Sequence, residues 1–322
     1  MFVQRERVWL EKQKKSYCVY TRMSGSADPS WAQQDKRRVL VIDIRVQNIE
    51  HTQQFYEQHL GMRLWRRLGD LQQGQFTSVC GYGPEQSNAS LHFHNDEQRS
   101  PVQLGKAFGH FSCSHPGLRI AKLIEDMQLT GTGRVSKVEE FEVANVESLR
   151  LGRDADKIAC VVDPAGFFWE VLERHERNVS EALCKVMLRV SGDLDTHIKF
   201  YHEVLGMRLI RKAHLAPGHH ECAYMSYKPS ERDGTWIELL LSDPAKVNDK
   251  GDGFQFIAIS TKNVFKTAES IRKANAPILQ DVGYFPGTAI TSVVTQDPSG
   301  WKYVFCSEED YLKDIESRQH VR

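Results

Sequence analysis

The sequence lacks any excess of charge and any long apolar run. Its 42 Lys and Arg residues balance 42 Asp and Glu residues, so no overall field favours nucleic acid or an anionic membrane as a partner. No segment approaches the ~20 consecutive apolar residues that a membrane-spanning helix needs. We therefore expect a chain that binds neither nucleic acid nor membranes.

Paired cysteines are also missing. The seven Cys residues are scattered, and no two of them form a C-x-x-C pair. An odd, unpatterned set is typical of reduced thiols rather than of a disulfide framework. The sequence therefore predicts a cytoplasmic protein. Its first 30 residues are basic and lack the apolar stretch of a secretory signal. They are interpreted either as an organelle-targeting leader or as a disordered extension.

A phrase of ten residues occurs twice. Residues 55–64 are FYEQHLGMRL and residues 200–209 are FYHEVLGMRL. A second repeated motif follows each copy, DPAGFFWE at 163–170 and DPSGWKYV at 297–304. Self-similarity over this length indicates a duplicated module. The copies differ at one informative position, since Glu170 in the first half corresponds to Val304 in the second.

The two halves share a predicted order of elements. Residues 39–46 are β-branched and predict a strand, and the apolar spacing of 49–60 predicts a helix that Gly61 ends. The second half repeats this order, with Gly206 as the helix stop. Each Asp-Pro-x-Gly unit is typical of a type I turn and predicts a hairpin. Each half is thus about β-α-β-β-β, and the fold class is α+β with mixed sheets in two tandem modules.

The predicted domain boundaries follow from these elements and from the 322-residue length, which suits two domains. A charged segment at 136–157 has no counterpart in the second half and predicts an exposed excursion. The divisions are an N-terminal extension at 1–35, a first module at 36–177, a second module at 183–310 and a C-terminal tail at 311–322.

Polar residues inside apolar strands mark the candidate chemistry, because burying them without partners costs several kcal/mol. His110 and Glu170 in the first half and Glu238 in the second meet this description. Alternation places Glu170 on one strand face with Phe168 and Leu172. Each polar residue alone is also explained by a solvated strand face, so the residues by themselves leave the site open.

Several motifs together resemble one family. The duplicated phrase, Gly-Tyr-Gly-Pro-Glu at 81–85, Phe-Gly-His-Phe at 108–111 and the Asp-Pro-x-Gly-x-x-x-Glu unit look like glyoxalase I, the lactoylglutathione lyases. This family belongs to the vicinal oxygen chelate group, and the single-chain layout is similar to its fused plant and protozoal form. The resemblance covers about residues 31–315. It implies curved mixed sheets around a composite cavity, and a monomer that mimics a dimer within one chain.

The resemblance also implies a ligand set. One composite metal site would use His110 and Glu170 from the first module with Glu238 from the second, and its fourth position falls on Lys185, where the family has Gln or His. The other site would need four residues that for the most part cannot bind a metal, namely Val41, His92, Phe256 and Val304. One active site is therefore expected, with Ni²⁺ or Zn²⁺ as the cofactor or no metal at all.

The implied reaction is methylglyoxal detoxification. The substrate would be the hemithioacetal of glutathione and methylglyoxal, which would be isomerised to S-lactoylglutathione through a metal-bound enediolate. Glu170 is the implied base, Glu238 a metal ligand and second acid–base group, and Arg189 and Lys106 the implied contacts to glutathione.

Lys185 departs from the family pattern, because a protonated ammonium has no lone pair to give a metal. Three arrangements remain open: a neutral lysine ligand, a metal with three protein ligands and an extra water, or an ammonium in the place of the metal between Glu170 and Glu238. The alternative function follows from this departure: a catalytically degenerate protein that binds a thiol conjugate or a partner. An extradiol dioxygenase would need His at position 41 or 185, which this chain lacks.

Overall fold

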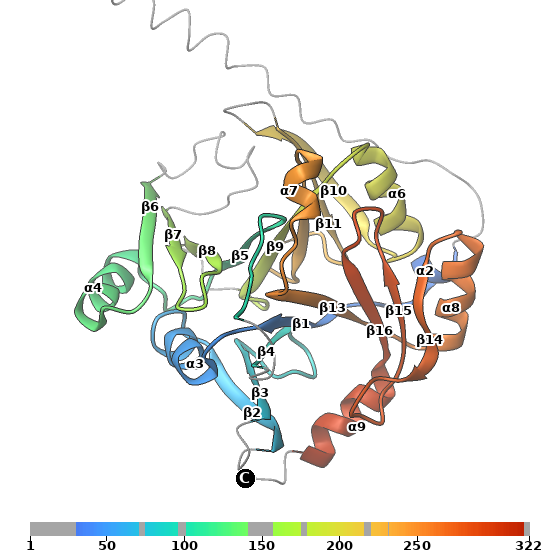
Figure 1. Ribbon diagram of the computed structural model, residues 1–322, viewed down its shortest axis with the longest axis horizontal. Helices are drawn as coiled ribbons and strands as arrows, with labels where there is room; N and C mark the ends of the chain where they lie inside the picture. Colours follow the sequence, from blue (N-terminus) through green and yellow to red (C-terminus); the bar gives the residue numbers. More distant parts are fainter. Residues whose placement is uncertain are drawn as a thin grey trace, which may run out of the picture.

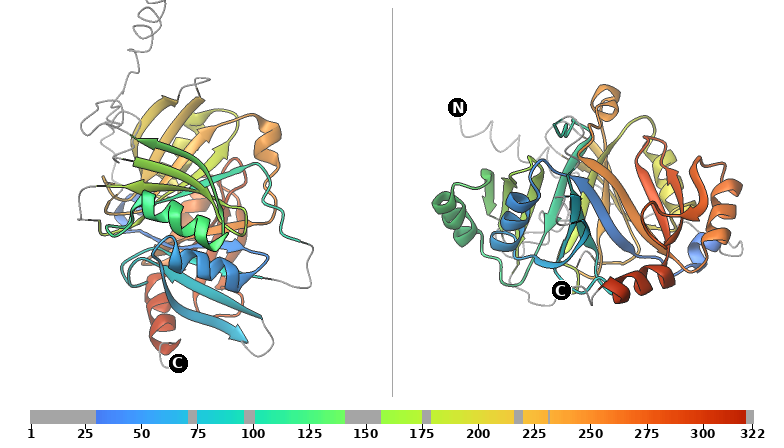
Figure 2. Two further views of the ribbon diagram at one scale, coloured as in Figure 1. Left: turned by 90° about the vertical axis from the view of Figure 1, so that its left-hand side faces the viewer. Right: turned by 60° about the horizontal axis from the view of Figure 1, so that its bottom comes forward.

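The fold consists of two curved sheets of eight strands each, which we call sheet A and sheet B (Figures 1 and 2). The computed structural model describes residues 30–70, 75–95, 101–140, 157–174, 179–215, 220–230 and 232–318. The strand order is β14-β15-β16-β13-β1-β4-β3-β2 in sheet A and β10-β11-β12-β9-β5-β8-β7-β6 in sheet B. The prediction of an α+β fold with mixed sheets is confirmed.

The order β-α-β-β-β occurs four times along the described chain, twice in each half. Unit one is β1 (Val39–Arg45), α3 (Ile49–Gln58), β2 (Arg63–Asp70), β3 (Gln75–Gly81) and β4 (Ser90–His94). Unit two is β5 (Phe108–Cys113), α4 (Ile120–Thr130), β6 (Arg134–Glu140), β7 (Lys157–Val162) and β8 (Phe168–Glu173). Unit three is β9 (Leu183–Val190), α6 (Leu194–Glu203), β10 (Arg208–Leu215), β11 (His220–Ser226) and β12 (Trp236–Leu241). Unit four is β13 (Phe254–Thr261), α8 (Val264–Lys273), β14 (Ile278–Tyr284), β15 (Thr291–Gln296) and β16 (Lys302–Ser307), and the short helix α7 (Pro244–Asn248) precedes it.

Each sheet joins one unit from each half of the chain. Sheet A contains units one and four, joined where β1 pairs antiparallel with β13. Sheet B contains units two and three, joined where β5 pairs antiparallel with β9. The two halves are therefore interleaved, and any site at the centre of either sheet takes residues from both.

The duplicated phrase ends a helix in both halves. Gly61 and Gly206 follow α3 and α6 with φ of 72° and 76°, a left-handed conformation that suits glycine. At Gly206 a side chain is also excluded by space, because a Cβ atom there would lie 2.1 Å from the carbonyl oxygen of Ala32.

In each half, the ten-residue phrase contacts the Asp-Pro-x-Gly motif. The hydroxyl of Tyr56, in the first phrase, donates to Asp163 Oδ2 of the Asp-Pro-x-Gly turn at 2.8 Å. Tyr201 donates to Asp297 Oδ2 at 3.1 Å in the second half. Both bonds are buried. The phrases recur together because each tyrosine joins one unit to the next.

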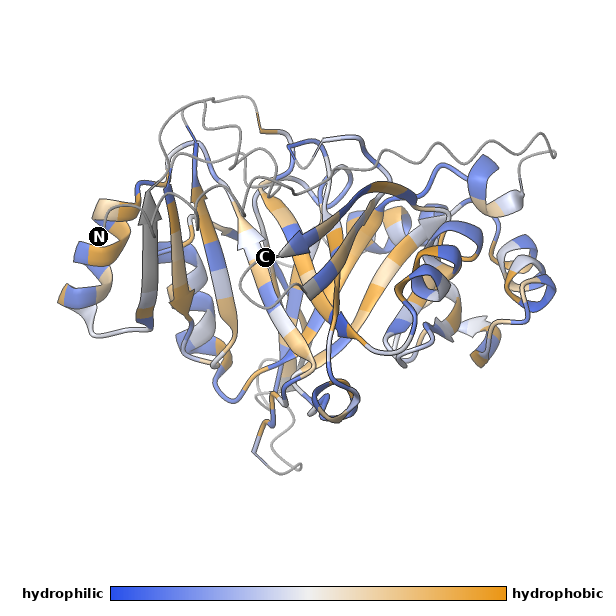
Figure 3. Cartoon of the chain, turned by 90° about the horizontal axis from the view of Figure 1, so that it is seen from above, coloured by the Kyte–Doolittle hydropathy of each residue, from blue (hydrophilic) through white to orange (hydrophobic). Residues whose placement is uncertain are grey.

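One apolar core extends through both sheets and the helices packed on them. Tyr56 on α3 lies edge-on to Phe93 of sheet A and to Trp169 of sheet B, at ring-centroid distances of 5.4 Å in each case. Figure 3 shows apolar residues concentrated along the strands, with hydrophilic residues on much of the outer helical surface. Smaller apolar clusters occupy further parts of both sheets, and one of them on sheet A includes Tyr311 and Ile315.

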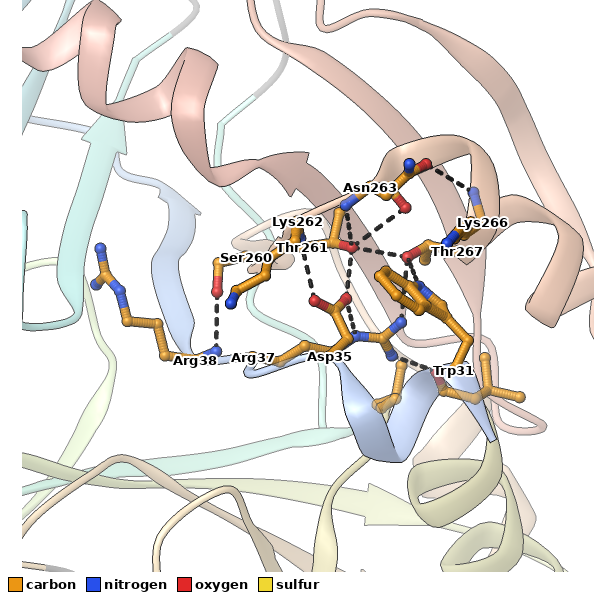
Figure 4. A network of polar contacts seen from close by, with 12 residues as sticks. Trp31, Asp35, Arg37, Arg38, Ser260, Thr261, Lys262, Asn263, Lys266 and Thr267 are labelled. Carbon is orange, nitrogen blue, oxygen red and sulfur yellow. Dashed lines mark hydrogen bonds and ion pairs between the residues drawn. The ribbon is translucent and has the colours of Figure 1, made fainter. Parts of the chain in front are cut away.

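Both predicted terminal segments contain ordered structure. Trp31–Gln34 form α2, within the predicted extension at 1–35, and Glu308–Arg318 form α9, which includes most of the predicted tail at 311–322. Trp31 Nε1 donates to Thr267 on α8 at 2.9 Å, and Asp35 binds both Arg37 and the backbone nitrogen of Lys262 (Figure 4). These residues are ordered because aromatic and charged side chains anchor them on unit four.

The predicted excursion at 136–157 includes strand residues at both of its ends. Residues 136–140 belong to β6, which pairs antiparallel with β7, and Lys157 begins β7. Residues 141–156 lie outside the described part of the chain, as do residues 1–29 of the N-terminal segment. In the described ranges, none of the helices combines the length and hydropathy that crossing a bilayer requires.

Candidate functional site

Strand register brings four sequence-predicted residues to the centre of sheet B. Lys185 on β9 lies opposite Ser112 on β5, and Ser112 lies opposite Glu170 on β8. On its other side Lys185 lies opposite Trp236, two residues before Glu238 on β12. His110 is two residues before Ser112 and therefore faces the same side of the sheet. Residues from both halves of the chain thus converge.

Lys185 joins the two carboxylates. Its Nζ lies 3.1 Å from Oε2 of Glu170 and 2.9 Å from Oε2 of Glu238. All three side chains are less than one tenth exposed. The two carboxylates would repel one another in this low-dielectric setting, and the shared ammonium offsets that repulsion.

Glu170 has two further neighbours. His110 Nε2 lies 3.2 Å from Glu170 Oε2, and the Ser112 hydroxyl donates to the same oxygen at 3.1 Å. One carboxylate oxygen therefore faces an imidazole, a hydroxyl and an ammonium. These contacts fix the orientation of Glu170 in an otherwise apolar strand.

Tyr224 on β11 forms the wall beyond Glu238, which lies opposite it across the ladder. Lys185 Nζ is 5.8 Å from the centre of the Tyr224 ring, and the Arg211 guanidinium lies over the same ring at 4.4 Å. Burial, and then the nearby Glu238 charge, raise the pKa of Tyr224 well above its usual value. This phenol therefore stays protonated, and two cations lie near its ring.

A cavity of about 450 Å³ opens beside these residues. Glu170 and His110 line it, and Glu170 contacts Lys185, which in turn contacts Glu238. Three basic side chains also line it, namely Lys106, Arg189 and Lys246. The cavity therefore combines an acid–base wall with a cationic surface that suits an anionic ligand.

The basic residues differ in their surroundings. Lys106 is largely exposed, with its Nζ 3.8 Å from Asp249 Oδ2. Burial lowers the pKa of Arg189, and the Glu238 charge partly restores it. Among the described residues no carboxylate lies within 4 Å of Arg189, whose Nη1 donates to the Met187 sulfur at 4.0 Å. The sequence pattern missed Lys246, because a single basic residue on a short helix carries no signal.

The equivalent positions in sheet A carry different chemistry. Val41 lies opposite Ala258, which lies opposite Val304, and the register therefore matches Val41 to Lys185 and Val304 to Glu170. Phe256 and His92 fall at the positions of His110 and Glu238. A largely apolar cavity of about 300 Å³ lies here, with Tyr311 of α9 among its lining residues. Neither carboxylate of sheet B has an acidic counterpart.

The fold agrees with that of known proteins. A family model described as the Glyoxalase/Bleomycin resistance protein/Dioxygenase superfamily matches residues 185–305. A protein named "Probable lactoylglutathione lyase, chloroplastic" from Arabidopsis thaliana is 35% identical over 288 residues, which cover 89% of this chain and 77% of that protein. The chain belongs to the lactoylglutathione lyase, or glyoxalase I, family.

Two further glyoxalase I relatives match nearly their whole length. The lactoylglutathione lyase of Oryza sativa is 31% identical, over 89% of this chain and 94% of that protein. The crystal structure of glyoxalase I from Zea mays superposes with a TM-score of 0.77 at 29% identity, covering 90% and 99% of the two chains. The chain is therefore a lactoylglutathione lyase-like member of an enzyme family, built as the tandem form.

Membership of the glyoxalase I family implies a divalent metal requirement in general, but the residues present here do not fit one. Lys185 Nζ lies between the two carboxylates that would bind the ion. An ammonium and a divalent ion 4 Å apart repel by about 8 kcal/mol at an effective dielectric constant of ~20. Across the described chain, no group of three or more His, Cys, Asp or Glu side chains is arranged to hold a metal. We therefore derive no chemical step through a metal.

Proposed function

We propose that the sheet B cavity is the single active site of this chain, and that it isomerises the hemithioacetal of glutathione and methylglyoxal to S-lactoylglutathione. The observation that carries this proposal is the position of Glu170. Its carboxylate lies in the cavity wall, 3.2 Å from His110 and within reach of the cationic surface. A carboxylate held beside an anion-binding surface is suited to moving a proton on a bound anionic substrate.

The reaction transfers one proton between adjacent carbons. Glu170 takes the proton from the carbon that bears the hydroxyl and the sulfur, and the electron pair of that C–H bond forms a double bond to the neighbouring carbon. The former carbonyl oxygen becomes negatively charged. Glu170 then returns its proton to the neighbouring carbon, and the proton of the original hydroxyl moves to the other oxygen. A thioester and a secondary alcohol result, with all atoms retained.

The remaining residues have supporting roles in this proposal. Lys185 provides a positive charge behind Glu170 as negative charge develops on the substrate. Glu238, held by the same ammonium, is the second acid–base candidate. Arg189 and Lys106 bind the carboxylates of the glutathione part, since a guanidinium can contact a carboxylate with two parallel hydrogen bonds.

Thioester formation from methylglyoxal and glutathione tests this function. Full-length protein is assayed with a chelator present and with Ni²⁺ or Zn²⁺ added. Glu170→Gln should lower kcat by about 10² to 10⁴-fold, the range for removing a general base. Glu269→Gln, an exposed substitution of the same kind on α8, should leave kcat unchanged. Absence of turnover under every condition would exclude the lyase.

A second candidate is a protein that binds a glutathione conjugate without converting it. The observation that favours it is the contact of Lys185 with both carboxylates, because Glu170 must leave an ion pair before it can take a proton. Calorimetry with an S-alkyl glutathione separates the two functions. Binding that Arg189→Gln weakens, with no thioester formed from the hemithioacetal, would identify the binding protein.

The state of assembly and the location are part of the proposal. Because each sheet already pairs one unit from each half, we expect a monomer, which light scattering during size-exclusion chromatography measures. We expect a cytoplasmic protein unless the N-terminal segment directs it to an organelle. Fusion of residues 1–35 to a fluorescent protein distinguishes the two locations.

A further inference from the structure

Lys185 lies between Glu170 and Glu238 in sheet B. In relatives from the same family, a metal ion would be needed at this place to hold two such carboxylates together. We propose that the Lys185 ammonium replaces the metal, so that this site is built to work without one, and that Lys185→Gln would turn it into a metal-binding site. This inference rests on the proposed function only for the role of Glu170 in proton transfer.

The position of the nitrogen is the first argument. Lys185 Nζ is 3.1 Å from Glu170 and 2.9 Å from Glu238, which are charge-assisted contact distances. The two acids belong to different halves of the chain, and β9 and β5 lie between their strands. The ammonium therefore connects the same two carboxylates that a bridging cation would connect.

The depth of the site is the second argument. Lys185, Glu170 and Glu238 are 4%, 6% and 4% exposed. Buried carboxylates without a compensating cation are strongly unfavourable. Removing the cation from such a group therefore destabilises the fold. The lysine supplies the compensation from within the chain, at every metal concentration.

The surrounding charge is the third argument. Arg211 lies 4.4 Å from the centre of the Tyr224 ring that Lys185 also faces, and Tyr224 lies opposite Glu238. The positive charge of Arg211 adds to that of Lys185 in this part of sheet B and lowers the attraction for a divalent ion. Such an ion would have to displace the ammonium from its ion pairs.

Sheet A supplies an internal comparison. There the position of Lys185 is Val41 and the position of Glu170 is Val304, and His92 stands at the position of Glu238. The sheet that keeps both acids has the lysine, and the sheet that lacks them has an apolar residue in its place. The lysine and the two acids thus occur together, as a charge-compensated group. Lys185 is accordingly a positioning residue, which acts through Glu170.

Metal content tests this inference separately from turnover. The full-length protein is stripped with a chelator, dialysed against Ni²⁺ or Zn²⁺, and its metal measured by mass spectrometry. Wild type should hold no stoichiometric metal, whereas Lys185→Gln should hold about one equivalent and gain thermal stability with added metal. Lys302→Gln, the same substitution at an exposed position on β16, should behave as wild type.

Further variants secure the interpretation. Lys185→Arg keeps the positive charge and should stay free of metal, while Lys185→His should bind it. If Lys185→Gln folds only when metal is added, the inference is supported. If it does not fold at all, the wild-type measurement still decides. One equivalent of metal in the wild type, lost in His110→Ala and in Glu170→Gln, would overturn the inference.

The two readouts separate this inference from the proposed function. Turnover by metal-free wild type supports both. If the wild type holds no metal and shows no turnover, the lyase function is excluded, but the inference that the lysine replaces the metal stands. Turnover that requires a stoichiometric metal keeps the lyase function and removes the inference.

Discussion

Sheets A and B share one architecture and use their centres differently. In sheet B the four central positions carry Lys185, His110, Glu170 and Glu238, and in sheet A the same positions carry three apolar residues and one histidine. Sheet A instead includes an apolar cluster that contains Tyr311 and Ile315 of α9. We propose that only the centre of sheet B carries chemistry, whereas the largely apolar centre of sheet A lines a cavity of about 300 Å³. The following predictions test that division.

The largest expected difference concerns the two equivalent residues of β9 and β1. Lys185→Met leaves two buried carboxylates without their cation and should lower the free energy of unfolding by about 3–5 kcal/mol. Val41→Ala in sheet A removes only apolar contacts and should cost about 2 kcal/mol or less. Urea denaturation measures both. Neutralising Glu170 and Glu238 in the Lys185→Met background should restore much of the loss, and failure to do so would mean that the lysine matters for packing alone.

Sheet A has its own buried acid, Glu85, which binds Arg66 at 2.8 Å. Burial alone would raise its pKa, but the nearby His92, whose Nε2 lies 3.7 Å from Oε1, and the contacts with Arg66 lower the pKa from 4.5 to about 2. Because the pKa is lower in the folded state, Glu85 stabilises the fold above pH 4.5, and this stabilisation is lost as the pH falls towards 2. It amounts to about 3 kcal/mol.

Glu85→Gln tests this pH dependence. The variant should be less stable than wild type at pH 7 and should lose less stability on acidification, as measured by urea denaturation at each pH. Burial also lowers the pKa of His92, so both proteins should weaken below pH 6.5 for a separate reason. Identical acid profiles below pH 4.5 would contradict the assignment of Glu85.

Substitution of two arginines at equivalent positions should have different effects, one on substrate binding and the other on stability. Arg189 lines the cavity of sheet B, whereas Arg45 at the same register of β1 is buried and paired with Asp252. Arg189→Gln should raise KM by about 10 to 100-fold, the equivalent of 1.5–3 kcal/mol for charge-assisted hydrogen bonds, with little change in kcat. Arg45→Gln should lower stability and leave KM unaltered. An unchanged KM in the first variant would remove Arg189 from the binding surface.

The smallest expected effect is one that both halves share. Tyr56→Phe and Tyr201→Phe each delete a buried hydrogen bond to the aspartate of a turn, at a cost of about 1 kcal/mol. The Tyr201 hydroxyl also contacts the Tyr303 hydroxyl, so the urea midpoint should shift somewhat more for Tyr201→Phe than for Tyr56→Phe. A larger shift for Tyr56→Phe would contradict this account of the duplicated contact.

Much of this arrangement was predictable from the sequence. The repeated phrase revealed the duplication, and strand alternation placed Glu170 on one face with Phe168 and Leu172. Family resemblance was needed to connect Glu170 with Lys185, because these residues lie on strands that meet only through tertiary structure. Which of the three arrangements Lys185 adopts depends on distances that no sequence pattern encodes.

The missed features have physical reasons. The β-α-β-β-β order was assigned once to each half, because units one and two share no phrase comparable to FYEQHLGMRL. No helix was predicted in the N-terminal extension or the C-terminal tail, because α2 is short and α9 is polar. Their order depends on a few distant anchors, such as Trp31 on α8 and Tyr311 against sheet A.

The interleaving of units has a consequence for synthesis of the chain on the ribosome. Sheet B uses two units that are neighbours in sequence, so all of its strands have been made once residue 241 is complete. In sheet A, the first strand, β1, cannot pair with β13 until more than 200 further residues have been synthesised. The group of Lys185, Glu170 and Glu238 can thus assemble early from units that are neighbours in sequence, while units one and four join last and at the greater entropic cost.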